Sequence, residues 1–338
     1  MTSFNSVGDQ SRSYQLRLSQ HLLKNKLDRL TKEVATGLKT DIPLALNGDL
    51  ARISHVDSRI TMLATYQQNA SEAKTMFESM QRVLERIQSS ADSIGPSIMT
   101  EANTSPDDIL RMRASQISLD FQSLFSALNT SIGGRHLFSG NRTDTAPLGS
   151  FGDMVSGLNA AVAGATTAND IITRIDDWFD APAGGGGFTD LIYNGNDTGN
   201  TRIAISDERT VGSNLTANSP DLKNLLKGMA ALTFVAESGA GLDSSTMRNI
   251  FTESGHKLVR ASTDLTVVRA MIGLQEAATT QTQAHNTAEN TSLSLIRSTL
   301  IAADPYETAT ALQETEASIQ NLYTLTARLS RLKLTDYL

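Results

Sequence analysis

The chain has 338 residues, of which 39% are hydrophobic, 19% are charged and 5% are aromatic, and its net charge is −7. This acidic balance argues against a general nucleic-acid binder, because phosphate contacts need a basic face. The absence of cysteine excludes disulfides, thiol nucleophiles and thiolate metal sites. No apolar run approaches the ~20 residues of a membrane span, and the first residues lack the basic flank and apolar core of a cleaved signal peptide.

The N-terminal segment predicts a helix over about residues 11–36 that ends at Gly37, a usual C-cap residue. One face of this helix carries apolar side chains at the spacing of a coiled-coil seam. These side chains are Leu16, Leu23, Leu27, Leu30 and Val34.

A helical rod is predicted next, because apolar residues from Ile53 to Ile94 alternate three and four residues apart. An ordinary helix averages only ~11–12 residues, so a pattern of this length indicates a rod. Residues 95–96, Gly-Pro, predict its end or a kink. A following helix is predicted to start with Ser105 as N-cap and Pro106 in the first turn, and to close at residues 133–134.

The middle of the chain, residues 134–219, changes character and becomes rich in glycine. Phe188–Tyr193 and Thr201–Ser206 predict short strands that flank a hairpin turn at Asn194-Gly195. Residues 170–179 predict one helix that carries the only tryptophan. We therefore expect a small mixed or β-rich domain inserted at the tip of a helical hairpin, where insertions are tolerated.

The return half of the chain predicts a helix after Ser219 that breaks at residues 239–241, and then a second rod that continues until Asp304-Pro305. The last helix, about residues 306–332, carries a second seam that can pair with the first. Its leucines are Leu322, Leu325, Leu329 and Leu332.

The sequence thus predicts a mainly α fold: long antiparallel helical rods and a coiled coil formed by both chain ends, with the small insert at the tip. We expect five segments. They are an N-terminal assembly arm (1–46), an ascending rod (47–133), the inserted outer domain (134–219), a descending rod (220–303) and a C-terminal assembly helix (304–338).

No constellation in the sequence indicates catalysis or a bound cofactor. The five histidines are scattered and lack the His-x-x-x-His spacing of a helical metal site. The loop at residues 194–200 lacks the acidic ladder of a calcium loop, and no Lys-Ser or Lys-Thr follows the glycine run at residues 184–187. We predict no catalytic, cofactor-binding or metal residues and no enzyme. The terminal seams are open to two interpretations, domain core or assembly interface.

Two stretches resemble a known family. Residues 321–332, Asn-Leu-Tyr-Thr-Leu-Thr-Ala-Arg-Leu-Ser-Arg-Leu, resemble the C-terminal helix of bacterial flagellins and their junction-protein relatives. Residues 134–145 are similar to the GR-x-LFSG-x-x-TDT signature of the hook–filament junction proteins, the flagellar hook-associated protein 3 family. The signature positions are Gly134, Arg135, Leu137, Phe138, Ser139 and Gly140.

The resemblance implies a structural, non-enzymatic protein of the bacterial flagellum that needs no cofactor. Members of the family form a ring of identical subunits between hook-associated protein 1 and the flagellin filament, through coiled-coil packing of their termini. They are exported uncleaved through the flagellar type III channel with a chaperone. From the acidic charge and the lack of a membrane span we expect no nucleic-acid or membrane partner. A filament-forming flagellin is the main alternative. An enzyme hosted in the insert and a cytoplasmic coiled-coil scaffold are further ones.

Overall fold

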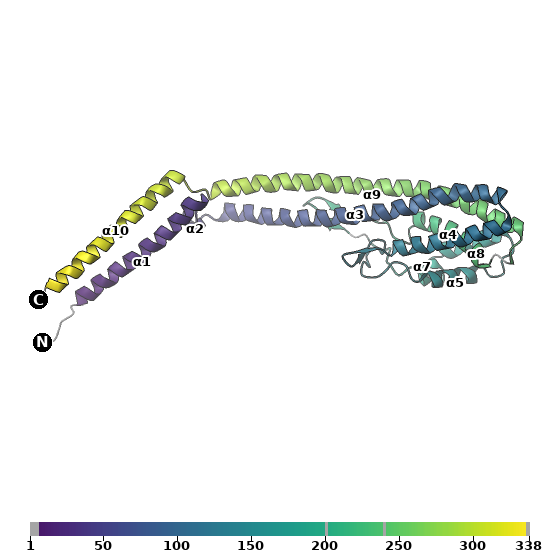
Figure 1. The fold of residues 1–338 in the computed structure, drawn as a ribbon, viewed down its shortest axis with the longest axis horizontal. Helices are drawn as coiled ribbons and strands as arrows, with labels where there is room; N and C mark the ends of the chain where they lie inside the picture. The colour runs from purple at the N-terminus through teal and green to yellow at the C-terminus, as the bar shows by residue number, and fades with distance from the viewer. Residues whose placement is uncertain (1–6, 200–201, 239–240, 336–338) are drawn as a thin grey trace. The chain divides into compact units, whose positions relative to one another are not determined.

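A computed structural model describes residues 7–199, 202–238 and 241–335, and within them it describes all side chains except those of residues 7–10, 238 and 329–335. The predicted mainly α fold with long helical rods is confirmed (Figure 1). The helices are α1 (Val7–Thr36), α2 (Ile42–Ala45), α3 (Ala51–Thr104), α4 (Asp107–Leu128), α5 (Phe151–Val162), α6 (Ala168–Asp180), α7 (Phe188–Leu191), α8 (Pro220–Ser238), α9 (Ser244–Leu300) and α10 (Pro305–Thr335). Two antiparallel two-stranded sheets complete the described fold, β1 (Ser131–Ile132) with β2 (Arg135–His136) and β3 (Ile203–Ala204) with β4 (Thr210–Val211).

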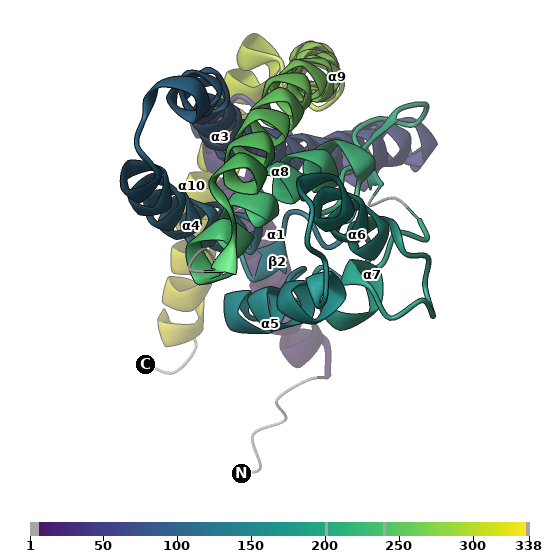
Figure 2. The same ribbon diagram turned by 90° about the vertical axis from the view of Figure 1, so that its right-hand side faces the viewer.

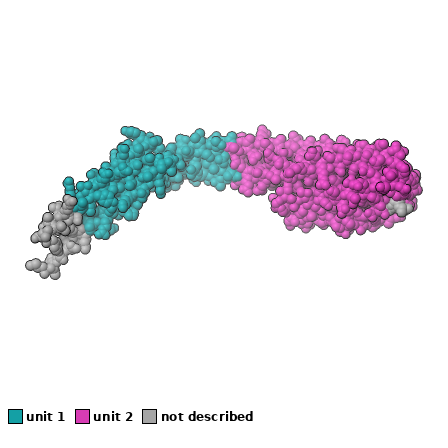
Figure 3. Space-filling view, viewed as in Figure 1, with its two compact units in different colours: residues 1–64, 288–338 teal, residues 65–287 magenta. Residues whose placement is uncertain are grey.

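The chain divides into two compact units (Figure 3). Unit 1 comprises residues 1–64 and 288–338, and unit 2 comprises residues 65–287. The long helices α3 and α9 each contribute residues to both units.

In unit 1, helices α1 and α10 lie side by side and antiparallel, so the two ends of the chain are partners (Figure 1). The loops at the base of this pair are joined by two backbone hydrogen bonds. The Lys39 amide donates to the Ile301 carbonyl at 2.8 Å, and the Ala303 amide donates to the Gly37 carbonyl at 2.9 Å. Gly37 ends α1 with a φ of +70°, a left-handed conformation that glycine adopts without steric cost.

The unit 1 portions of α3 and α9 are joined by ion pairs. Arg59 Nε and Glu289 Oε1 are 2.7 Å apart, and Arg297 Nε and Asp57 Oδ1 are 2.6 Å apart. All four side chains are partly exposed, so solvent screening leaves each pair a small contribution to stability. The buried apolar residues of this part of α3 are Ile53, Val56 and Leu63, as the rod pattern predicts.

In unit 2, α4 packs along α8, and α5, α6 and α7 group beside α8 (Figure 2). Edge-to-face aromatic contacts join α4 to α5: the ring centroid of Phe151 lies 5.3 Å from that of Phe121 and 5.7 Å from that of Phe125. The predicted helix with the tryptophan is confirmed as α6, whose Thr167 cap accepts a hydrogen bond from the Asp170 amide. The buried Lys227 of α8 pairs with Asp180 at the end of α6 at 2.6 Å.

Helix α9 loses its apolar seam beyond Ile272 but stays helical. Polar side chains of this part of α9 contact the β3–β4 hairpin. Thr282 and Asn286 occupy buried positions there. The Asn286 side-chain amide donates to the Ile205 carbonyl at 2.8 Å, and Arg209 donates to the Thr282 hydroxyl at 3.3 Å. A buried polar group that is hydrogen-bonded carries little penalty, so these positions hold the hairpin on the rod.

Of the two alternatives predicted for residues 95–96, an end of the rod or a kink, the end is wrong, because α3 continues through Pro96 to Thr104. Proline forfeits one helical hydrogen bond, but the surrounding helix is held by tertiary contacts. A Cβ built on Gly95 would lie 3.0 Å from Val259 Cγ2 and 3.3 Å from Leu258 Cβ. The glycine therefore serves close packing of α3 on α9 and does not terminate the helix.

Both predicted ends of the next helix are also wrong. Pro106 occupies the N-cap position of α4, and the Ser105 amide still donates to the Glu101 carbonyl of α3. At the other end α4 stops at Leu128, with Asn129 as C-cap. Gly133 and Gly134 form the turn between β1 and β2, with φ of +57° and +78°.

The predicted hairpin around Asn194-Gly195 does not form. Residues 188–191 are the short helix α7, and β3 pairs with β4 across a later turn. The 194–199 loop instead lies against residues 139–148, with the Asn196 amide donating to the Ser139 carbonyl at 2.9 Å. An Asn-Gly dipeptide favours a tight turn locally, and here these long-range contacts override that preference.

Candidate functional site

The predicted seam between the chain ends is only partly covered in a single chain. Leu30 is 5% exposed, whereas Leu16, Leu23, Leu27 and Leu322 are half-buried. Val34 is 46% exposed and Leu325 is 51% exposed. The side chains of Leu329 and Leu332 lie outside the described residues. The structure thus brings the two seams to the same helix pair, and this pair leaves apolar area in contact with water.

A second apolar row on α1 was missed by the sequence analysis. Tyr14, Leu18 and Leu22 are 69%, 49% and 59% exposed. At 100° per residue this row lies on the side of α1 opposite to the seam. Its signal was present as a spacing of four residues, but a period of four is easily masked by the stronger seam pattern.

The family-signature residues complete the β1–β2 hairpin and build the loop that follows it. Phe138 is fully buried, and its carbonyl accepts from the Ala217 amide at 2.9 Å. Ser139 is fully buried as well, and its hydroxyl donates to the Thr145 carbonyl at 2.8 Å. Gly134 supplies the β1–β2 turn and Arg135 is exposed on β2.

Gly140 is the most constrained position of the signature. Its φ is +64°, and a Cβ there would lie 1.9 Å from the Asn196 carbonyl oxygen. The loop that presses on it is held by Asp197, whose carboxylate accepts from Tyr193 at 2.7 Å and from Thr216 at 2.8 Å. Burial and this acceptor raise the pKa of the Tyr193 phenol well above its usual value.

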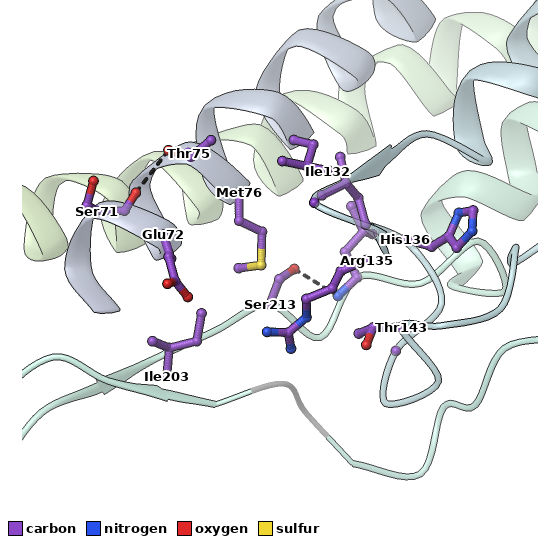
Figure 4. Close-up of a pocket in the computed structure, with 14 residues that line it drawn as sticks. Ser71, Glu72, Thr75, Met76, Ile132, Arg135, His136, Thr143, Ile203 and Ser213 are labelled. Carbon is purple, nitrogen blue, oxygen red and sulfur yellow. Dashed lines mark hydrogen bonds between the residues drawn. The ribbon is translucent and has the colours of Figure 1, made fainter. Parts of the chain in front are cut away.

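Part of the signature also lines a cavity of about 450 Å³ in unit 2 (Figure 4). Met76 of α3, Ile132 of β1, Ile203 of β3 and Leu137 give it an apolar lining, and Glu72 and Arg135 are its carboxylate and guanidinium. Its volume lies within the ~300–1,000 Å³ range of pockets that enclose ligands. The cavity could not be predicted from the sequence, because its walls come from four segments far apart in the chain.

The perturbed carboxylates of the described residues serve structural contacts. Asp243 precedes α9 and accepts from the Thr246 amide at 2.9 Å, and hydrogen bonds from Ser245 and Thr246 lower the pKa of its carboxyl. The glycine run at residues 184–187 is closed by Asp190. This carboxylate accepts from the Gly184 and Gly186 amides, which lower its pKa.

Across the described part of the chain, no group of three or more His, Asp or Glu side chains could hold a metal ion. Within the same residues, no helix combines the length and the apolar character needed to cross a bilayer.

The fold and these surfaces define a mainly α class of protein, in which the two chain ends pair as antiparallel helices and leave apolar seams in contact with water.

Residues 10–143 match the family described as the bacterial flagellin N-terminal helical region. This match indicates a flagellin-like helical region in the N-terminal part of the chain. Fifteen chains of solved structures match significantly. Among them is a putative flagellar hook-associated protein from Vibrio parahaemolyticus, with 16% identity over 72% of this chain and 96% of that chain and a TM-score of 0.41. No curated protein matches significantly.

Proposed function

We propose that the chain is a structural adaptor of the bacterial flagellum, forming the junction ring between hook-associated protein 1 and the flagellin filament. The observation that carries this proposal is the incomplete burial of the terminal seam in a single chain, with Leu325 51% exposed. The match of residues 10–143 to the flagellin N-terminal region supports the flagellar setting. The resemblance of residues 134–145 to the junction-protein signature supports the junction position.

The mechanism is assembly through the terminal helices. Removal of apolar surface from water is the dominant favourable term in most protein–protein associations. The exposed rows of α1 and α10 are therefore surfaces that gain free energy when neighbouring subunits cover them. In this proposal residues 1–46 and 304–338 are the assembly segments, and residues 134–219 face outward. The protein is exported to the extracellular flagellum with a chaperone, and its partners are identical subunits, hook-associated protein 1 and flagellin.

The second candidate is a filament-forming flagellin, because the flagellin N-terminal match applies to it equally. The two functions differ in copy number. A junction protein is present as one short ring for each filament, whereas a flagellin is present along the whole filament. Labelling of isolated flagella with an antibody against this chain separates the two directly.

The test of assembly uses Leu325→Asp together with Leu329→Asp, which places two charges on the α10 seam. We expect loss of filament attachment with an unchanged helical circular dichroism spectrum, because a buried unpaired charge is costly in an interface. The matched control is Ala327→Asp, an exposed position on the other side of α10 that should tolerate the charge. Normal attachment by the double variant would exclude the seam as an assembly surface.

A further inference from the structure

Helices α1 and α10 carry opposite charges that a single chain leaves unpaired. The second half of α1 bears the cations Lys26, Arg29 and Lys32, and the first half of α10 bears the carboxylates of Glu307 and Glu314. Among the residues that the structure describes, none of these side chains has a partner in a hydrogen bond or an ion pair. The Nε atom of Arg29 is even buried without a hydrogen-bond partner. The pair of terminal helices therefore presents complementary charges to a neighbour.

The same two helices carry exposed leucines at a matching distance from these charges. Leu18 of α1 is 49% exposed, and Leu325 of α10 is 51% exposed. Leu18 precedes Arg29 by eleven residues, and Glu314 precedes Leu325 by eleven residues. Eleven residues are three helical turns to within about 20°, or about 16 Å along the axis. Each leucine thus lies on the same face of its helix as the charged residue.

The register of the helix pair shows the height of these residues along the pair. The Gln20 side-chain amide donates to the Tyr323 hydroxyl at 3.2 Å, so these two residues are at the same height. Both leucines lie two residues from this bond toward the chain ends, and Arg29 and Glu314 both lie nine residues from it in the other direction. Because α1 and α10 are antiparallel, the two leucines are at one height and the two charged residues at another (Figure 1).

Within one chain the two faces point away from each other. Leu18 belongs to the row on the side of α1 opposite to the seam. Leu325 lies about 80° around α10 from Thr315, which is buried in the helix pair. A second copy that is related to the first by rotation alone keeps the same heights. Its α10 face can therefore meet the α1 row of the first copy with the leucines and the charges both in register.

The other charged groups near these faces do not oppose such a contact. Glu33, one turn after Arg29, is buried, and its carboxylate accepts from the Thr40 amide at 3.0 Å. Asp28 lies about 100° around α1 from Arg29. On α10, Arg328 is at the height of the uncharged start of the α1 row. The cations of α1 are thus the charges that a neighbouring Glu314 meets.

We propose that the α1 row of one copy packs on α10 of the next copy, with Leu18 against Leu325. In the same contact Arg29 faces Glu314. The contact joins two different faces, so it is heterologous and continues around a ring. The leucines form its apolar core, and the charges select the register, because complementary charges disfavour wrong alignments. The proposal rests on the proposed function, since it names the terminal surfaces through which the ring subunits meet.

Two charge-reversed chains test the contact. One carries Arg29→Glu with Lys32→Glu, and the other carries Glu307→Lys with Glu314→Lys. Either chain alone places like charges at every contact, whereas alternating copies of the two restore opposite charges. We expect at least tenfold less chain on isolated flagella from either chain alone, and recovery in cells that express both. The matched control is Lys24→Glu, an exposed position about 140° around α1 from Arg29, which should attach normally.

Two results of this test would overturn the proposal. Normal attachment of either reversed chain by itself means that the charges do not meet between copies. Absence from flagella when both chains are expressed, with a normal helical circular dichroism spectrum for each, means that the charges act within one chain or on another partner.

A second test keeps the native charges and uses the absence of native cysteine. Full-length chains with Leu18→Cys and with Leu325→Cys are mixed and treated with a short bis-maleimide. We expect covalent dimer from the mixture at least tenfold above that from either variant alone. The matched control replaces Leu325→Cys by Ala327→Cys, on the other side of α10, and should give only the background. Equal yields from the two mixtures would contradict the contact.

The same cysteine pair expressed in flagellated cells separates the contact from the junction function. Chain present on isolated flagella without cross-linked dimer contradicts the contact alone. Chain absent from flagella, with cross-linked dimer in the purified mixture, contradicts the junction function alone.

Discussion

Gly95 of α3 and Gly255 of α9 face each other where the two long helices pack. A Cβ on Gly255 would lie 2.3 Å from Met99 Cγ and 3.0 Å from the Gly95 carbonyl oxygen. The first distance is shorter than real Cβ contacts and the second is at their short limit, so the close approach of the two helices depends on the missing methyl groups.

Gly255→Ala should therefore lower the free energy of unfolding by about 1–3 kcal/mol, because overpacking forces a shift of Met99 or of the helix backbone. Gly273→Ala is the matched control in the same helix, where the nearest atom to a new Cβ is Gln81 Nε2 at an ordinary 3.7 Å. This control should raise stability by about 0.5–1 kcal/mol, since alanine is the better helix former. Urea denaturation followed by circular dichroism measures both, and equal effects would contradict the packing argument.

Gly140→Ala should be more damaging than Gly134→Ala. Both glycines have positive φ, which costs an alanine about 1–2 kcal/mol. Only Gly140 also has a backbone atom in the way, the Asn196 oxygen, whereas Gly134 has open space around a new Cβ. Proteolysis of the 194–199 loop should become faster in the first variant and not in the second. The opposite order would show that backbone strain alone decides.

Asp107 should make stability depend on acid pH. Its carboxylate accepts from Ser244 at 2.9 Å and from Arg248 at 2.6 Å, and these contacts lower the pKa of this group from the usual 3.8. A lowered folded pKa means that the stabilisation is present above pH 3.8 and is lost as pH falls through the folded value. Asp107→Asn should therefore lower the melting temperature at pH 7 and flatten its fall below about pH 4. Thermal denaturation at a series of pH values measures both proteins, and an equally steep fall in Asp107→Asn would contradict this assignment.

Tyr193 should make stability depend on alkaline pH. Its phenol keeps its proton in the folded chain beyond the usual pKa of 10.0, because it is buried and donates to Asp197. The unfolded chain releases this proton near pH 10, so stability falls as pH rises above that value. Absorbance titration should show a step of tyrosine ionisation that appears only as the chain unfolds. In Tyr193→Phe this late step should disappear, and its persistence would assign it to another tyrosine.

Much of the helical layout could be predicted because it follows from local pattern. The seam residues of α1, the rod from Ile53 onward and the helix with Trp178 are amphipathic over many turns, so burying one face contributes more free energy than any single turn or cap. The errors concern Gly95, Ser105 and Asn194-Gly195. Each is a local signal of a turn or cap worth about 1 kcal/mol, which long-range packing outweighs.

The sequence by itself determined the helices, their apolar faces and the pairing of the chain ends, because periodicity records which side of a helix avoids water. It also carried the signature of residues 134–145. Only the tertiary structure decided that α3 and α9 approach closely at Gly95 and Gly255. It also decided that the Asn196 carbonyl leaves no room for a side chain at Gly140. The cavity lined by Met76, Leu137 and Ile203 is likewise a result of the tertiary structure. These relationships join residues tens to hundreds of positions apart, and no local preference of a chain encodes such a distance.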